Sequence, residues 1–239
     1  MKVLIVKCYT TQAEWGKQMI ESFTGHIKRH EPSAGIDILN IMDGDTPPDP
    51  SQYRLVIFSG GTFNLLTDDT FPPWVDSALE FIRAISSMPI PVTKLVGVCW
   101  GHQAVQFALG GKLGVLEDAP RIGVEEINLT PEGQKFLGGQ TPTSTLNLHK
   151  FHKRYVTEPA PNFTPLATNN EILLSNTGQI LTMQSHPELS EKLSRGILEG
   201  ADGGYTSSSI MTDAGVKLLS VNSEHAGAKV WDVIMEWCK

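Results

Sequence analysis

The chain has 239 residues, which suits one α/β domain, and its hydrophobic content of 40% is enough for a large core. The formal net charge is -7, and so acidic a surface argues against nucleic acid or an anionic membrane as the main partner. The sequence has no apolar run of transmembrane length and does not begin like a signal peptide.

The three cysteines are Cys8, Cys99 and Cys238. Their odd number and their spacing fit neither a disulfide framework nor a zinc motif. Free thiols are typical of a reducing compartment, so we expect a cytoplasmic protein. We expect neither a metal nor a cofactor.

The first half of the chain alternates short apolar runs with longer segments of helical periodicity. Continuous apolar runs such as Val3 to Val6 suit central strands that are buried on both faces. From Thr11 to His30, apolar residues recur every four positions, which predicts a helix with one apolar stripe. This order predicts a doubly wound parallel sheet. The expected strands are 3–6, 36–41, 55–58 and 95–99, and the expected helices are 11–30, 71–87 and 101–109.

After Gly110-Gly111 the sequence changes to short β-like runs with turn residues between them, which fit antiparallel strands that extend the sheet. The Gly- and Ser-rich segment from Ala201 to Ser209 predicts a loop. We find no internal repeat or linker and expect a single domain over residues 1–239. The later expected strands are 124–129, 145–149, 171–174 and 179–183, and the later expected helices are 189–199 and 227–238.

A cysteine lies where one predicted strand turns into a predicted helix, in Gly97-Val98-Cys99-Trp100-Gly101. Hydrolases place serine nucleophiles on strained turns of this kind. Small neighbours suit the turn because an extra Cβ would clash with the tight backbone. A buried structural thiol is the alternative, but a position at a helix N-terminus favours a reactive Cys99.

A cysteine nucleophile needs a base, and the base needs a group that orients it. His186 and Glu188 follow the last predicted strand. If His186-Pro187-Glu188 is extended, its first and third side chains face the same way. A carboxylate in contact with the imidazole would fix its tautomer and stabilise imidazolium, whereas a surface turn is the structural alternative.

Two glycines, Gly60 and Gly61, follow the predicted strand 55–58. They would expose backbone N–H groups at the carboxyl edge of the sheet, where ligands bind in open α/β folds. Together with the N–H of Trp100, one of them could form an oxyanion hole. A plain turn at the end of the strand is the alternative.

The segment Gly97-x-Cys99-x-Gly101-His102-Gln103, with Ser59-Gly60-Gly61 upstream and His186-Pro187-Glu188 downstream, resembles the class I (triad) glutamine amidotransferases. The likeness runs over nearly the whole chain and is greatest to the stand-alone branch, which is similar to the glutaminase domain of GMP synthase and to γ-glutamyl peptidases. It implies a flavodoxin-like three-layer α/β sandwich with a mixed, mostly parallel doubly wound sheet and a small antiparallel extension.

The resemblance also implies roles for single residues. Cys99 would attack the γ-carboxamide carbon of a γ-glutamyl group, His186 would shuttle the proton, and Glu188 would orient His186. Water would then hydrolyse the γ-glutamyl thioester, without any cofactor. Gln103 matches the family position that contacts the amino-acid moiety of the substrate, and His149 matches a segment that borders the pocket.

The chain departs from the family pattern near these positions. Trp100 stands where Tyr or Phe is common, Thr62-Phe63-Asn64 differs from the usual oxyanion loop, and Ser185 replaces an aromatic residue or Gly. We expect Trp100, Asn64 and the segment 149–154 to surround whatever is attached to the γ-glutamyl group, and we include Asn64 among the substrate-binding residues.

The substrate stays open between two kinds of small γ-glutamyl molecule. One is glutamine, with its ammonia delivered to a separate synthetase. The other is a γ-glutamyl peptide or glutathione conjugate, and the lack of a Walker-type sequence or synthetase region favours such a free-standing hydrolase. A non-catalytic binding member of the fold is a third reading.

Two further groups of basic residues allow a functional and a structural reading. His26 and His30 are four residues apart on a predicted helix, and the lack of other ligands at motif spacing favours a solvated face over a metal pair. The basic segment 149–154 could bind a substrate carboxylate or phosphate, or it could be a solvated strand end.

Overall fold

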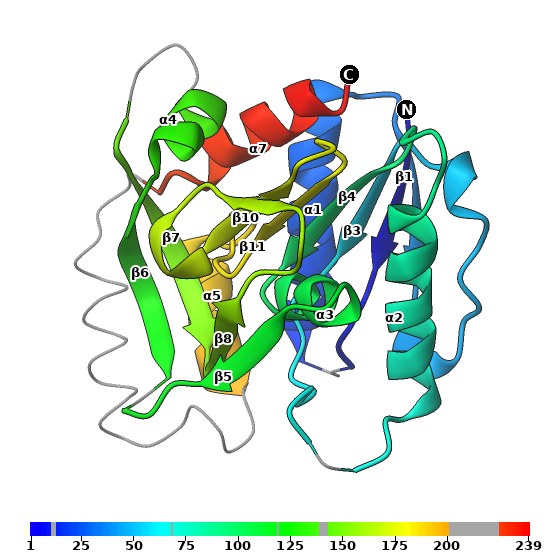
Figure 1. The fold of residues 1–239 in the computed structure, drawn as a ribbon, viewed down its shortest axis with the longest axis horizontal. Helices are drawn as coiled ribbons and strands as arrows, with labels where there is room; N and C mark the ends of the chain where they lie inside the picture. Colours follow the sequence, from blue (N-terminus) through cyan, green and yellow to red (C-terminus); the bar gives the residue numbers. More distant parts are fainter. Residues whose placement is uncertain (11–12, 68, 119, 139–142, 201–224) are drawn as a thin grey trace.

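The computed structural model describes residues 1–10, 13–67, 69–118, 120–138, 143–200 and 225–239 (Figure 1). The predicted loop from Ala201 to Ser209 lies outside these residues. Among the described residues, a seven-stranded sheet has the order β2-β1-β3-β4-β11-β10-β9. Its strands are β1 (Lys2–Val6), β2 (Gly35–Leu39), β3 (Leu55–Phe58), β4 (Lys94–Val98), β9 (Phe163–Pro165), β10 (Ile172–Ser175) and β11 (Ile180–Met183).

Helices cover both faces of this sheet (Figure 1). They are α1 (Glu14–His30), α2 (Pro73–Ser86), α3 (Trp100–Ala108), α4 (Pro131–Leu137), α5 (Glu191–Gly200) and α7 (Gly227–Trp237). Short 3-10 turns occupy 41–43, 50–52 and 168–170. The predicted three-layer sandwich is confirmed, with a mostly parallel sheet in the middle layer. Of the described helices, none is long and apolar enough to cross a membrane.

The two cores follow from the alternation of side chains along buried strands. In β1, Val3 and Ile5 face the core under α1 and α7, while Leu4 and Val6 face the core under α2 and α3. All four residues are 2% exposed or less. Continuous apolar runs are therefore required, because a polar residue at any of these positions would be buried.

The apolar stripe predicted for the first helix is confirmed in α1. Met19, Phe23 and Ile27 are buried at 3% exposure or less, and they pack in the same core as Trp231 of α7. The ring of Phe23 meets that of Trp231 edge to face, with centroids 5.8 Å apart. Helices from opposite ends of the chain thus cover one face of the sheet together.

One expectation about the second half was wrong. The segment 179–183 was expected to form an antiparallel strand of an extension, but β11 is a central strand that pairs parallel with β4 and antiparallel with β10. Its residues are all buried, and a short buried run carries no sign of strand direction. This pairing brings the end of β11 beside the end of β4, which precedes Cys99.

The antiparallel extension itself is built from two separate strand pairs. β6 (Arg121–Asn128) pairs with β7 (Thr145–His152), and β5 (Lys112–Val115) pairs with β8 (Arg154–Glu158). The sequence patterns did not predict β5, β8, β9 or α4, and they ended β7 three residues early. Short strands in polar surroundings lack a strong alternation of apolar residues, so pairing partners decide their extent.

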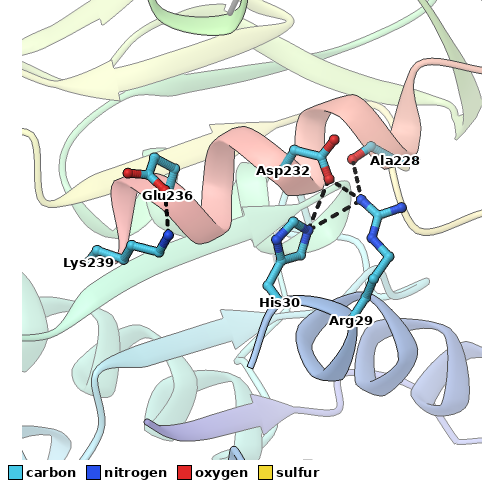
Figure 2. A network of polar contacts seen from close by, with 6 residues as sticks. All are labelled: Arg29, His30, Ala228, Asp232, Glu236 and Lys239. Carbon is cyan, nitrogen blue, oxygen red and sulfur yellow. Dashed lines mark hydrogen bonds and ion pairs between the residues drawn. The ribbon is translucent and has the colours of Figure 1, made fainter. Parts of the chain in front are cut away.

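The end of α1 and the start of α7 are joined by a polar network (Figure 2). Asp232 accepts from Arg29 and lies 2.9 Å from His30 Nε2, and Arg29 also donates to the carbonyl of Ala228. His26, one turn earlier, stacks on Trp231 at 5.4 Å. The predicted solvated face at His26 and His30 is therefore wrong, because α7 packs against it.

We predict that the buried ring of Trp231 contributes far more to stability than the neighbouring polar network of Arg29 and Asp232. Trp231 is fully buried, so Trp231→Ala is expected to lower the free energy of unfolding by about 3–5 kcal/mol. The Arg29 and Asp232 side chains are about half exposed, so Asp232→Asn should cost only about 0.2–1 kcal/mol. Urea denaturation measures both values, and an equal loss in the two variants would contradict this ranking.

Candidate active site

The nucleophile candidate occupies a strained turn between β4 and α3. Cys99 has φ 51° and ψ -101°, a conformation that a residue with a Cβ rarely adopts. Its glycine neighbours allow the turn. A Cβ on Gly97 would lie 2.7 Å from the carbonyl oxygen of Gly101, and a Cβ on Gly101 would collide with the carbonyl oxygen of Phe58.

The predicted base and its orienting carboxylate lie in contact. His186 Nδ1 and Glu188 Oε1 are 2.7 Å apart, and the two side chains are 5% and 0% exposed. Pro187 and Glu188 form a turn, so the condition of an extended His186-Pro187-Glu188 segment is not met over all three residues. Within the described residues, His186 Nε2 has no hydrogen-bond partner. This nitrogen is therefore available to a neighbouring group.

Charge favours a protonated His186. Burial opposes protonation, but the Glu188 carboxylate and the Cys99 thiol outweigh it and raise the pKa of His186 to about 10. The influence of Cys99 places thiol and imidazole within electrostatic reach of each other. At neutral pH, this environment favours an imidazolium.

Gly60 lies between the predicted catalytic side chains. A Cβ built on Gly60 would be 2.9 Å from His186 Cε1 and 3.6 Å from Cys99 Cβ. The thiol of Cys99 donates to the carbonyl of Phe151 at 3.5 Å. The ends of β3, β4, β7 and the segment after β11 thus meet around one sulfur atom.

The other predicted oxyanion residues lie next to this point. Gly61 packs so closely on Cys8 that a Cβ would collide with the carbonyl oxygen of Cys8. Trp100 is the first residue of α3, where a backbone N–H has no partner within the helix. Its ring is 1% exposed and packs against Trp74 at 5.3 Å, in the core under α2. The ring of Trp100 thus lies in the core, and a role of its N–H in an oxyanion hole stays a prediction.

The predicted substrate contact Gln103 is buried and already engaged. Its Nε2 donates to the carbonyl of Arg154 at 2.9 Å and to Gln184 Oε1 at 3.1 Å. The side chain therefore ties α3 to the start of β8 and to the segment that precedes His186. A substrate contact through Gln103 stays a prediction.

His149 contacts the triad through its backbone. Its carbonyl accepts from the N–H of His186 at 2.8 Å, and its ring approaches Ser194 Oγ at 3.0 Å and the ring of His225 at 4.6 Å. Asn64 is exposed and its Oδ1 accepts from the N–H of Leu66, within its own loop. The structure thus brings Cys99, His186, Glu188 and Gly60 together, whereas the side chains of His149 and Asn64 have other partners.

The basic segment is not a solvated strand end as far as residue 152. His149, Lys150 and His152 are 6% exposed or less. Lys150 Nζ lies 2.6 Å from Glu171 Oε1 and 3.4 Å from Glu125 Oε2. The buried ammonium of Lys150 is therefore paired with these two carboxylates, because an unpaired buried charge would be destabilising.

Several residues near the site could not be found from the sequence. Ser194 and His225 reach the triad region only through strand pairing and helix packing, and no motif marks them. Phe151 lies in the predicted segment 149–154, but its contact with Cys99 needed the structure. His152 and Gln184 line part of a polar cavity of about 520 Å³, together with His102 and Lys150. Among the described residues, no three His, Cys, Asp or Glu side chains are grouped to hold a metal ion.

A cysteine on a strained turn, an imidazole with a buried carboxylate and nearby backbone donors can together perform nucleophilic acyl chemistry. On a doubly wound sheet, this arrangement is that of triad amidotransferases. The class I glutamine amidotransferase family model matches residues 19–198, and the chain belongs to this family. The resemblance inferred from the motifs is confirmed.

Similar proteins agree with this assignment. The chain is 38% identical to glutamine amidotransferase-like protein chry6 of Gibberella zeae, over 99% of this chain and 94% of that protein. It is 23% identical to gamma-glutamyl peptidase 2 of Arabidopsis thaliana, over 66% of this chain and 63% of that protein. A glutamine amidotransferase of Thermotoga maritima has the same fold, with a TM-score of 0.76, 17% identity and coverage of 100% and 98% of the two chains.

We predict that buried neutral histidines around the site make the fold sensitive to acid. Burial lowers the pKa of His102, His149 and His152 to about 3, below about 6.5 for an unfolded chain. Between these values the unfolded state binds more protons, so stability falls as pH falls from 6.5 toward 3. The raised pKa of His186 acts above pH 6.5, where its contribution is lost as pH rises toward 10.

The variant His102→Gln tests this effect. It removes one titrating ring and should reduce the pH slope of the unfolding free energy by up to about 1.4 kcal/mol per pH unit near pH 5. Urea denaturation at intervals from pH 7 to pH 5 measures the slope. A slope equal to that of the unchanged protein would contradict the prediction.

Proposed function

We propose that this protein hydrolyses a γ-glutamyl amide bond through Cys99, His186 and Glu188. One observation carries the proposal. Cys99 is held at φ 51° beside the imidazole of His186, which is hydrogen-bonded to the buried carboxylate of Glu188. Gly60 packs against the side chains of both Cys99 and His186. A strained nucleophile costs stability, and such strain is typical of functional sites.

The reaction would proceed in two stages. The Cys99 thiolate attacks the γ-carbonyl carbon, and backbone N–H groups of Gly61 and Trp100 stabilise the oxyanion. The imidazolium of His186 donates its Nε2 proton to the leaving amine, and a γ-glutamyl thioester remains. His186, now neutral, takes a proton from water, which attacks the thioester and releases glutamate and the Cys99 thiolate.

Glu188 contributes orientation and charge. Its bond to Nδ1 holds Nε2 toward the sulfur atom, and its charge is the foremost cause that raises the pKa of His186. Because the carboxylate is fully buried, water screens this interaction little. Glu188 therefore supports both the thiolate–imidazolium pair and the proton transfer.

For the substrate, we propose a γ-glutamyl peptide or glutathione conjugate, cleaved by a free-standing enzyme. The similarity to gamma-glutamyl peptidases of Arabidopsis thaliana supports this choice. Glutamine, with ammonia passed to a separate synthetase, is the alternative that the family membership supports. We further propose that the protein acts in the cytoplasm, where its thiols stay reduced.

Glutamate release separates these substrates. The purified protein is incubated with glutamine, with glutathione and with S-conjugates of glutathione, and free glutamate and ammonia are followed. We expect glutamate from the peptides in the unchanged protein and none above background with Cys99→Ala, which leaves the fold intact. Release from glutamine alone would support the alternative, and release from none of them would favour a binding protein. Turnover by Cys99→Ala would exclude the proposed nucleophile.

We predict that Glu188→Gln lowers kcat by about 10²–10⁴-fold, since proton transfer by a correctly oriented base is worth about this much. Loss of the carboxylate also removes the foremost cause of the raised pKa of His186. Imidazolium is then lost at lower pH, so the alkaline limb of the kcat/KM profile should move to lower pH. Initial rates from pH 5 to pH 10 measure this limb. An unmoved limb would contradict the assigned role.

A further inference from the structure

The side chain of Ser59 lies at the end of β3, immediately before the two glycines of the site. It is fully buried. Its Oγ accepts from the N–H of Cys8 at 2.9 Å and donates to the carbonyl of Gly60 at 2.9 Å. The hydroxyl therefore links the chain after β1 to the peptide group between Gly60 and Gly61.

The backbone of Ser59 is fixed as well. Its N–H donates to the carbonyl of Val6 at 3.1 Å, and its carbonyl accepts from the N–H of Gly101 at 3.2 Å. Gly101 lies in the first turn of α3, two residues after Cys99. Ser59 is thus held rigidly between the end of β1 and the turn that carries the nucleophile.

The orientation of one peptide group follows from these bonds. In a trans peptide, the carbonyl and the N–H point in opposite directions, and no cis peptide occurs in the described residues. Ser59 holds the carbonyl of Gly60 on the side of Cys8. The N–H of Gly61, which belongs to the same peptide, therefore points away from the Ser59 hydroxyl.

The catalytic side chains border the same two glycines. The Cβ position of Gly60 faces His186 Cε1 at 2.9 Å and Cys99 Cβ at 3.6 Å, whereas that of Gly61 faces the carbonyl of Cys8. A glycine peptide has little rotational preference of its own, because no side chain restricts it. An external hydrogen bond is needed to keep its N–H in one direction.

We infer that Ser59 is a positioning residue, whose hydroxyl fixes the Gly60–Gly61 peptide so that the N–H of Gly61 meets the oxyanion. This inference rests on the proposed γ-glutamyl hydrolysis. Ser59 does not touch the reacting atoms and acts through the backbone of Gly60. Its loss should therefore affect the transition state, in which the oxyanion forms, more than substrate binding.

The test compares Ser59→Ala with Ser59→Thr and a matched control, Ser175→Ala. Ser175 is also buried, and its Oγ accepts two backbone N–H groups, from Gln179 at 3.1 Å and Ile180 at 2.9 Å, in the turn between β10 and β11. Its Oγ also lies 3.0 Å from Thr177 Oγ1. Ser175→Ala thus removes at least as many buried hydrogen bonds as Ser59→Ala, away from the triad. Ser59→Thr keeps the hydroxyl.

We expect Ser59→Ala to lower kcat by up to about 10²–10³-fold, the loss seen when one oxyanion donor is removed, with KM changed less than threefold (about 0.6 kcal/mol). Alkylation of Cys99 by iodoacetamide forms no oxyanion, so its rate should stay at that of the unchanged protein. Ser175→Ala should keep kcat, and Ser59→Thr should restore most of it. An equal fall of kcat and alkylation rate in Ser59→Ala, or a fall no greater than in Ser175→Ala, would overturn the inference.

A second measurement is independent of turnover. In protein labelled with 15N-glycine, the amide signal of Gly61 should shift in Ser59→Ala and stay in place in Ser175→Ala. An unshifted Gly61 signal would overturn the inference even if the enzyme is active. If the unchanged protein hydrolyses no γ-glutamyl compound, the proposed function fails, while a shifted signal still shows that the Ser59 hydroxyl contacts the Gly60–Gly61 peptide.

Discussion

The tight turn at Cys99 is the constraint on which the rest of the site depends. A residue with a Cβ at φ 51° is strained, and the turn persists because surrounding structure holds both of its ends. β4 lies between β3 and β11 in the sheet, and the N–H of Cys99 donates to the carbonyl of Met183 at 2.9 Å. The sheet thus fixes the proposed nucleophile before any substrate binds.

The neighbouring strands deliver everything else to the same edge. β3 ends in the glycine loop and β11 leads to His186, so the parallel pairing of three strands brings three chain segments to one sulfur atom. The extension closes the site from a fourth direction, with the carbonyls of His149 and Phe151 against His186 and Cys99. Groups held this way need little rearrangement during the proposed reaction.

Burial sets the electrostatics of the site. Five histidines lie close to it. Burial lowers the pKa of His102, His149, His152 and His225, while Glu188 and Cys99 raise that of His186. The difference arises because only His186 has a buried carboxylate as its direct partner. One imidazole is thereby charged at neutral pH among neighbours that stay neutral.

The sequence by itself determined the parallel sheet, the two-sided burial of β1 and the apolar stripe of α1, because these depend on local periodicity. It also pointed to the motif residues Cys99, His186 and Glu188, because their motifs depend on short spacings. Only the tertiary structure decided the parallel direction of β11, the burial of Lys150 and the contacts of Phe151 and Ser194 with the site. Those features depend on which strands pair and which helices pack across long stretches of sequence. The role inferred for Ser59 likewise needed the structure, because the direction of a glycine N–H is set by a hydrogen bond and not by its own side chain.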